Sequence, residues 1–126
     1  EKRMKYWEHA VQTINEALIL LDEDYNIIQF NRAFQNLIGI PEDEIPKKKA
    51  YQLLHGTDSP PERCVTCRAL SEKNNAHSEY LEPYLNKCLR VSVEPVYNRN
   101  GNFEFAVEKI EEVSGQKSED NKTQGN

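Results

Sequence analysis

The chain has 126 residues, which is enough for one domain with a single buried core. Charged residues make up 29% and apolar residues 37%, as in an ordinary globular domain, and the net charge is −5. This charge disfavours contact with nucleic acid or an anionic membrane, because few cations remain to neutralise phosphates. The longest apolar run, from Ala17 to Leu21, is too short to span a membrane.

Cysteine usage and the N-terminus favour the cytoplasm. Three cysteines are an odd number and too few for a disulfide scaffold, which indicates a reducing compartment. The first residues, EKRMKYWEH, are too polar for a signal peptide. The sequence starts without methionine, and we interpret it as a piece of a longer protein.

Residues 1–16 are predicted to form an amphipathic helix. The apolar residues that recur at spacings of three and four are Met4, Trp7, Val11, Ile14 and Leu18. Such a seam suits pairing with a second copy in a homodimer. It covers only about two heptads, so the helix could equally lie on its own domain.

Two short strands and several short helices are expected next. The strands lie within residues 16–31, around a turn rich in Asp and Asn at 22–26. Asn31 is predicted to cap a short helix that Gly39 ends, and a second short helix over 47–56 ends at Gly56. Pro61 favours the first turn of a further helix that runs to about Lys73, with Ser59 as its cap.

Three strands are expected after the helices, at 76–84, 86–97 and 103–113, with an Asn-Gly hairpin turn between the last two. Alternation puts Leu89, Val91 and Val93 on one face of the second of these strands. It puts Phe103, Phe105 and Val107 on one face of the third, with a loss of phase at Ile110. Residues 115–126 hold no hydrophobic side chain and are expected to be a disordered tail or linker.

This order predicts an α+β domain over residues 17–114, with a five-stranded antiparallel sheet and short helices on one face. The stretch EALILLDEDYNIIQFNRAFQNLIGI resembles the opening of a PAS domain, and the list of matching positions is Asn31, Ala33, Phe34, Leu37 and Gly39. The stretch VSVEPVYNRNGNFEFAVEKIEEVS is similar to the last hairpin of that family. The resemblance implies a sensory, non-catalytic module that biases a downstream domain of a bacterial or archaeal signalling protein, such as a sensor histidine kinase.

The resemblance also implies a ligand site between the inner sheet face and the short helices. The candidate lining residues are Phe34, Tyr51, Leu54, Leu89, Val91, Val93, Phe105 and Val107. The same side chains could instead simply fill the core. Light-sensing flavin chemistry needs an Asn-Cys-Arg-Phe-Leu-like helix, and ERCVTCRAL does not match it.

The segment HGTDSPPERCVTC, residues 55–67, brings a histidine and a Cys-x-x-Cys pair together. A c-type haem needs histidine directly after the second cysteine, where this chain has Arg68, and an iron–sulfur cluster usually takes four cysteines. A metal or redox switch at His55, Cys64 and Cys67 is the alternative, with Cys88 as a conceivable fourth ligand. The favoured interpretation is that Cys64 and Cys67 pack on the core as reduced thiols.

No catalytic pattern stands out. The sequence has no Gly-rich phosphate loop, and its three histidines, His9, His55 and His77, are scattered. We therefore expect a sensor that binds a small ligand or a partner. The alternatives are a ligand-free dimerisation module and a metal- or redox-responsive switch.

Overall fold

The computed structural model describes residues 2–62 and 64–113. The expected tail at 115–126 and the side chains of Met4 and Trp7 lie outside that description. The elements, in chain order, are α1 (Lys2–Thr13), β1 (Ala17–Leu21), β2 (Ile27–Phe30), α2 (Arg32–Ile38), the 3₁₀ helix η1 (Glu42–Lys47), α3 (Ala50–His55), α4 (Val65–Glu72), β3 (Ala76–Glu82), β4 (Lys87–Tyr97) and β5 (Phe103–Val113).

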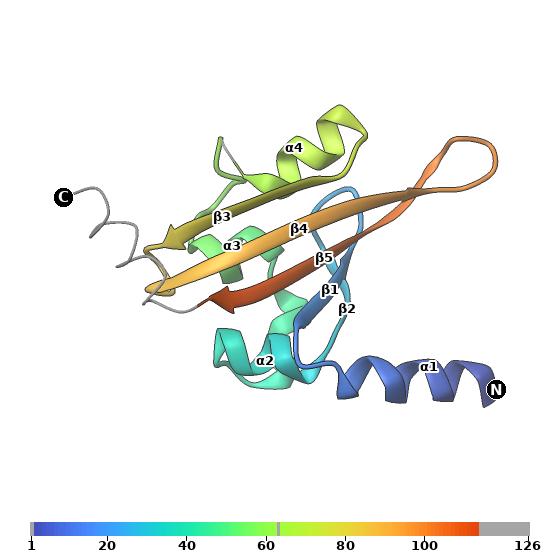
Figure 1. The fold of residues 1–126 in the computed structure, drawn as a ribbon, viewed down its shortest axis with the longest axis horizontal. Coiled ribbons are helices and arrows are strands. Elements are labelled where there is room, and N and C mark those ends of the chain that lie inside the picture. Colours follow the sequence, from blue (N-terminus) through green and yellow to red (C-terminus); the bar gives the residue numbers. More distant parts are fainter. Residues whose placement is uncertain (1, 63, 114–126) are drawn as a thin grey trace.

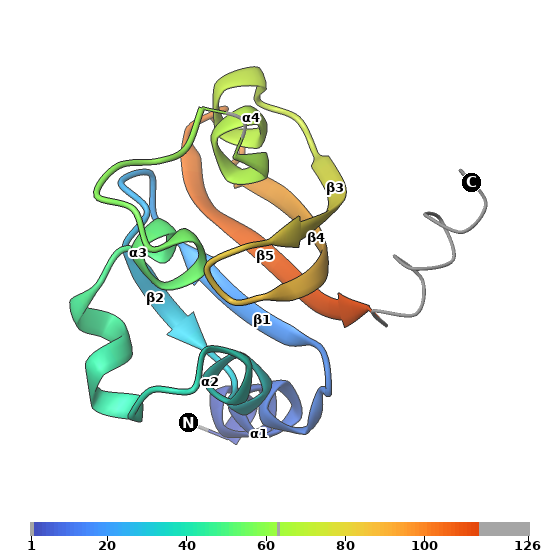
Figure 2. The same ribbon diagram turned by 90° about the vertical axis from the view of Figure 1, so that its left-hand side faces the viewer.

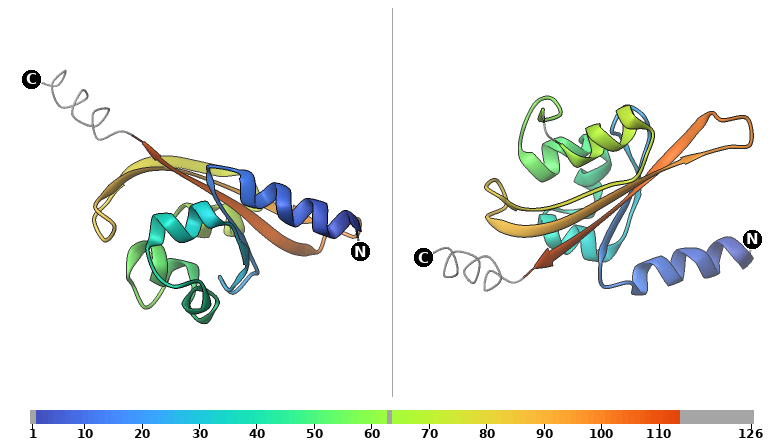
Figure 3. Two further views of the ribbon diagram at one scale, coloured as in Figure 1. Left: turned by 90° about the horizontal axis from the view of Figure 1, so that it is seen from below. Right: turned by 45° about the horizontal axis from the view of Figure 1, so that its top comes forward.

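The five strands form one antiparallel sheet in the order β2-β1-β5-β4-β3. The helices α2, α3 and α4 lie over one face of this sheet, which Figure 2 shows from the helix side. Helix α1 instead extends away from α3 and α4 (Figures 1 and 3). The predicted α+β architecture is therefore confirmed, including the short helices on one face.

The inner face of the sheet carries the core, because every second residue of the central strands points toward the helices. Leu89, Val91 and Val93 are all buried there, as the alternation in β4 predicted. The largest side chains that complete the core are Ile19, Leu21, Phe34, Ile45 and Ile110.

Strand β5 has the opposite phase from the predicted one. Its buried residues are Ala106, Glu108 and Ile110, and Ala106 lies opposite Leu21 of β1. Phe105 and Val107 therefore point to the outer face, where they are only half-buried. The prediction placed them inward because it followed hydrophobicity, whereas the sheet buries the small alanine and a glutamate instead.

Helix α1 is shorter than the expected residues 1–16, and it ends at Thr13. Ile14 lies beyond it and is 42% exposed, while Leu18 is part of β1. Val11 is 4% exposed, so it packs on its own domain. The residues of the predicted seam therefore do not share one continuous helical face.

Asn31 is buried where β2 meets α2, and it caps that helix as predicted. Its Oδ1 accepts hydrogen bonds from the amides of Phe34 and Leu18, each at 3.0 Å. Its Nδ2 donates to the carbonyl oxygens of Glu16 and Val11, at 3.0 and 3.3 Å. One side chain thus joins α1, β1 and α2.

Helix α4 begins later than predicted. It starts at Val65 with Cys64 as its N-cap, and Ser59 is not the capping residue. Cys64 has an extended backbone, with φ −64° and ψ 134°, and therefore stands outside the helix. None of the helices within residues 2–62 and 64–113 combines the length and apolar character needed to cross a membrane.

Candidate functional site

A hollow of about 340 Å³ opens between the end of α3, the approach to α4 and strand β3. This volume falls in the range that small-molecule sites occupy. Its wall combines apolar side chains with a few polar ones: His55, Pro61, Cys64, Val65, Ser78, Tyr80, Leu81, Glu82 and Pro83. A mixed lining of this kind suits a small molecule with an apolar body.

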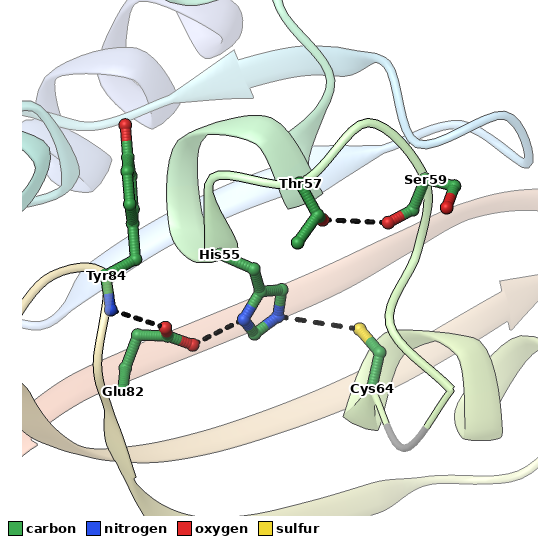
Figure 4. A network of polar contacts seen from close by, with 6 residues as sticks. All are labelled: His55, Thr57, Ser59, Cys64, Glu82 and Tyr84. Carbon is green, nitrogen blue, oxygen red and sulfur yellow. Dashed lines mark hydrogen bonds and ion pairs between the residues drawn. The ribbon is translucent and has the colours of Figure 1, made fainter.

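His55 is the last residue of α3, and Gly56 ends that helix in the left-handed conformation, with φ +66°. The His55 Nδ1 contacts the Glu82 Oε1. Glu82 is buried, and its second oxygen, Oε2, accepts a hydrogen bond from the Tyr84 amide at 2.9 Å. The backbone of the β3–β4 turn therefore fixes Glu82, and Glu82 fixes the imidazole (Figure 4).

The free edge of the imidazole faces a thiol. With Nδ1 carrying the proton toward the Glu82 carboxylate, the neutral ring leaves Nε2 as an acceptor. The Cys64 Sγ lies 3.8 Å from this Nε2 (Figure 4). Tyr80 stacks on the face of the His55 ring, with ring centroids 6.3 Å apart and an angle of 29° between the planes.

Opposing effects act on the Cys64 thiol. Burial raises its pKa, and the negative charge of Glu108 adds to this increase. The amides of Cys67 and Thr66, at the start of α4, act in the opposite direction. Since the net pKa is raised, the resting thiol keeps its proton.

Glu108 is buried on the inner face of β5. Burial raises its pKa to about 7, while the hydrogen bond from Thr66 lowers it. Thr66 Oγ1 donates that bond to Oε1 at 2.9 Å, from the first turn of α4. Burial also raises the pKa of Tyr80, and the charges of Glu108 and Glu82 contribute to the rise.

The predicted pocket residues do not line this hollow. Those of the set that lie on the inner side are Phe34, Tyr51, Leu54, Leu89, Val91 and Val93. Five of these six are buried in the core, and Tyr51 meets the edge of Tyr25 at 5.6 Å. Phe105 and Val107, on the outer face, cannot contribute to an inner pocket.

The ligand set of the alternative metal switch, His55, Cys64 and Cys67, comes together only in part. Cys64 approaches His55, but the Cys67 Sγ lies 3.0 Å from the Tyr25 hydroxyl. Within residues 2–62 and 64–113, no group of three or more His, Cys, Asp or Glu side chains could hold a metal ion. The three-ligand set is therefore not assembled, and all three cysteines are free thiols.

Three residues of the site escaped sequence reasoning, namely Glu82, Thr66 and Glu108. Glu108 carried a usable signal, since it sits two residues from both Ala106 and Ile110 and shares their face. The pairing of Glu82 with His55 joins residues 27 positions apart, and no local pattern encodes it.

An antiparallel sheet with short helices over one face defines an α+β domain. A family model described as PAS fold matches residues 5–108. The chain therefore belongs to the PAS family, whose members are in general sensory modules without catalytic activity.

Solved structures support this assignment at the level of the fold. The PAS domain of a Colwellia psychrerythraea protein is 15% identical, with a TM-score of 0.66, and the match covers 90% of this chain and 98% of that one. A sensory box sensor histidine kinase from Vibrio cholerae is 19% identical, with a TM-score of 0.62 and coverages of 90% and 93%. An RNA-binding light-oxygen-voltage receptor is 16% identical, with a TM-score of 0.80 and coverages of 98% and 37%. No curated protein matches the chain.

Proposed function

We propose that this PAS domain is a cytoplasmic sensor in which a small molecule occupies the hollow beside His55 and biases a downstream output domain, such as that of a sensor kinase. The observation that carries the proposal is a pair of contacts at the start of α4: Cys64 contacts His55 at the hollow, and Thr66 is hydrogen-bonded to Glu108 of the central strand β5. The likeness to a sensor histidine kinase domain supports the signalling context.

The route of the signal begins at the wall of the hollow. An occupant would contact His55, Tyr80 and Cys64, and Cys64 is also the N-cap of α4. Two residues further on, Thr66 is hydrogen-bonded to Glu108 of β5. A shift at the start of α4 therefore changes the partner of a buried carboxyl group in the strand that leads to Val113. The ligand acts by favouring one of two such arrangements.

The test compares two serines on opposite faces of the sheet. Ser78 lines the hollow, and Ser78→Phe fills it, whereas Ser92→Phe adds the same ring to the alternate face of β4. We expect at least one compound from a panel of small neutral carbonyl and aromatic molecules to raise the Tm of the wild type and of Ser92→Phe, but not of Ser78→Phe. The same compound should slow amide hydrogen exchange in residues 108–113.

Two outcomes would contradict the proposal. One is a panel in which nothing stabilises the wild type at millimolar concentration. The other is a compound that stabilises Ser78→Phe as strongly as the wild type, because that compound binds elsewhere.

A ligand-free dimerisation module is the second candidate. The outer face supports it, since Leu18, Leu20 and Val107 are apolar and only half-buried there. Tyr6 on α1 is 68% exposed and adds apolar surface. In this case α1 and the outer face would pair with a second copy, and the hollow would have no role in the signal.

A further inference from the structure

We propose that Cys64 is a covalent capture site for small α,β-unsaturated carbonyl compounds, with His55 as its base and Glu82 as the residue that orients His55. This inference rests on the proposed sensory role of the hollow and names the chemical class of its occupant. It follows from the arrangement of the three side chains, because each one is positioned by the next.

The thiol, the imidazole and the carboxylate are arranged in the order that activates a nucleophile. A thiol lies within reach of an imidazole nitrogen, and a carboxylate holds the far side of the ring. The carboxylate is itself fixed by the Tyr84 amide, so the imidazole has a defined tautomer and direction. The separation of 3.8 Å between Cys64 Sγ and His55 Nε2 is within the looser range of sites without a bound substrate.

The chemistry balances without any further reactant. The Cys64 sulfur attacks the β-carbon of the unsaturated carbonyl compound, and His55 Nε2 takes the thiol proton as the S–C bond forms. The electron pair of the C=C bond moves to the enolate, and the proton returns from His55 to the α-carbon. The product is a thioether, with no leaving group and no change in the number of electrons.

The raised pKa of Cys64 explains why a base is needed. A buried thiol next to Glu108 stays protonated, so it is a poor nucleophile without proton removal. The wall of the hollow fits the rest of such a molecule, since Pro61, Val65 and Leu81 can hold an apolar chain behind the reactive carbon.

Capture would also act on the route of the signal. Cys64 is the N-cap of α4, so a thioether adds bulk where the helix starts. It also removes an ionisable thiol from the neighbourhood of Glu108. Both changes act close to the Thr66–Glu108 hydrogen bond, because Thr66 follows Cys64 by two residues.

The experiment labels the whole chain with N-ethylmaleimide, a simple α,β-unsaturated carbonyl probe, and maps the adducts by mass spectrometry over time. Cys67 and Cys88 serve as internal reference thiols, because both are half-buried and free. We expect Cys64 to react faster than Cys88 despite its greater burial. We expect His55→Gln to slow Cys64 by roughly tenfold or more and to leave Cys88 unchanged.

Glu82→Gln tests the positioning role separately. It keeps an acceptor for His55 but removes the charge, so the Cys64 rate should fall less than in His55→Gln and its pH profile should change. An unchanged Cys88 rate in every variant confirms that the fold is intact, since unfolding would expose all three thiols. The proposal is overturned if Cys64 reacts no faster than Cys88, or if His55→Gln leaves the Cys64 rate unaltered.

Failure of the capture site and failure of the sensory role give different results. His55-dependent labelling that leaves hydrogen exchange in residues 108–113 unchanged supports the chemistry and contradicts the proposed sensor. A non-covalent compound that slows this exchange in Cys64→Ser, while wild-type Cys64 resists the probe, supports the sensor and overturns covalent capture.

Discussion

Thr66 Oγ1 and Glu108 Oε1 are 2.9 Å apart, and their hydrogen bond joins the first turn of α4 to the middle of β5. Both residues are buried, and they lie 42 positions apart in the chain. The bond gives an acidic group in the core a single side-chain donor. Stability is therefore expected to depend on the protonation state of Glu108.

Glu108→Gln should change how stability depends on pH. Because the pKa of Glu108 is about 7 in the fold against 4.5 ordinarily, the native state keeps a proton that the unfolded chain has released between those values. The contribution of Glu108 to the free energy of unfolding therefore falls as pH rises from 4.5 to 7 and is level above. Between pH 4 and pH 8, the free energy of unfolding of the wild type should fall by on the order of 2–4 kcal/mol more than that of the variant. Urea unfolding of both proteins across this range measures the difference, and parallel curves would contradict the assignment.

Thr66→Val is the companion change, because it removes the donor and keeps the shape of the side chain. The loss in the free energy of unfolding should be larger at pH 8 than at pH 5 and reach about 1–3 kcal/mol. At pH 8 the variant leaves the charged carboxylate of Glu108 without its hydrogen-bond donor. Thr57→Val is the control, since Thr57 Oγ1 donates its hydrogen bond to the exposed carbonyl of Ser59. A cost of Thr66→Val that is independent of pH would show that Glu108 stays neutral throughout.

Asn31→Ala should be among the most damaging single changes outside the apolar core. The variant loses the cap of α2 and leaves the amide of Leu18 and the carbonyl of Glu16 without their partner. We expect a loss of about 2–4 kcal/mol in the free energy of unfolding. Asn36→Ala, on the exposed side of α2, is the matched control and should cost less than about 0.5 kcal/mol. Similar losses in the two variants would mean that Asn31 contributes no more than a surface residue.

Gly56→Ala should cost more than Gly39→Ala. Both glycines have positive φ, +66° and +79°, so both variants pay for a left-handed alanine, roughly 1–2 kcal/mol. Only at Gly56 would the new methyl group overlap a neighbour, the ring of Tyr84. Thermal unfolding of both variants measures the difference. Equal Tm losses would show that the Tyr84 ring turns aside freely.

Tyr6→Glu should weaken self-association if the outer face and α1 form a homodimer. Tyr6 is 68% exposed on α1, and a charge there would have to be desolvated on dimerisation. Light scattering of the wild type at high concentration should report a dimer, and the variant should shift toward monomer. Tyr84→Glu, at a tyrosine 60% exposed in the β3–β4 turn, should leave the mass unchanged. A wild type that is already monomeric rules out this interface.

The sequence was sufficient for the fold because its signals are local. Asn31 and Gly39 mark the two ends of α2, and the alternation around Val91 marks the buried face of β4. The prediction of the buried face of β5 was wrong because the outer residues Phe105 and Val107 are more hydrophobic than the buried Ala106 and Glu108. Hydrophobicity alone cannot recognise a strand whose buried face includes an acidic side chain.

The site was only half predictable. The segment with His55 and Cys64 stood out by composition, and the structure brings these two side chains together. Cys67 has a different partner, the Tyr25 hydroxyl, because α4 starts at Val65 and turns the two cysteines in different directions. Glu82 completes the arrangement from β3, and a contact across the sheet edge leaves no periodic trace in the sequence.

The pairing of Ala17 with Ile110 places the first residue of β1 beside the C-terminal part of β5. Since the two strands are antiparallel neighbours, the start of β1 and the end of β5, at Val113, lie at the same end of this strand pair. A small shift of β5 along β1 would therefore displace Val113 relative to Ala17. In the proposed sensor, an event at the hollow would change the relative position of these two strand ends, with no need for the sheet to open.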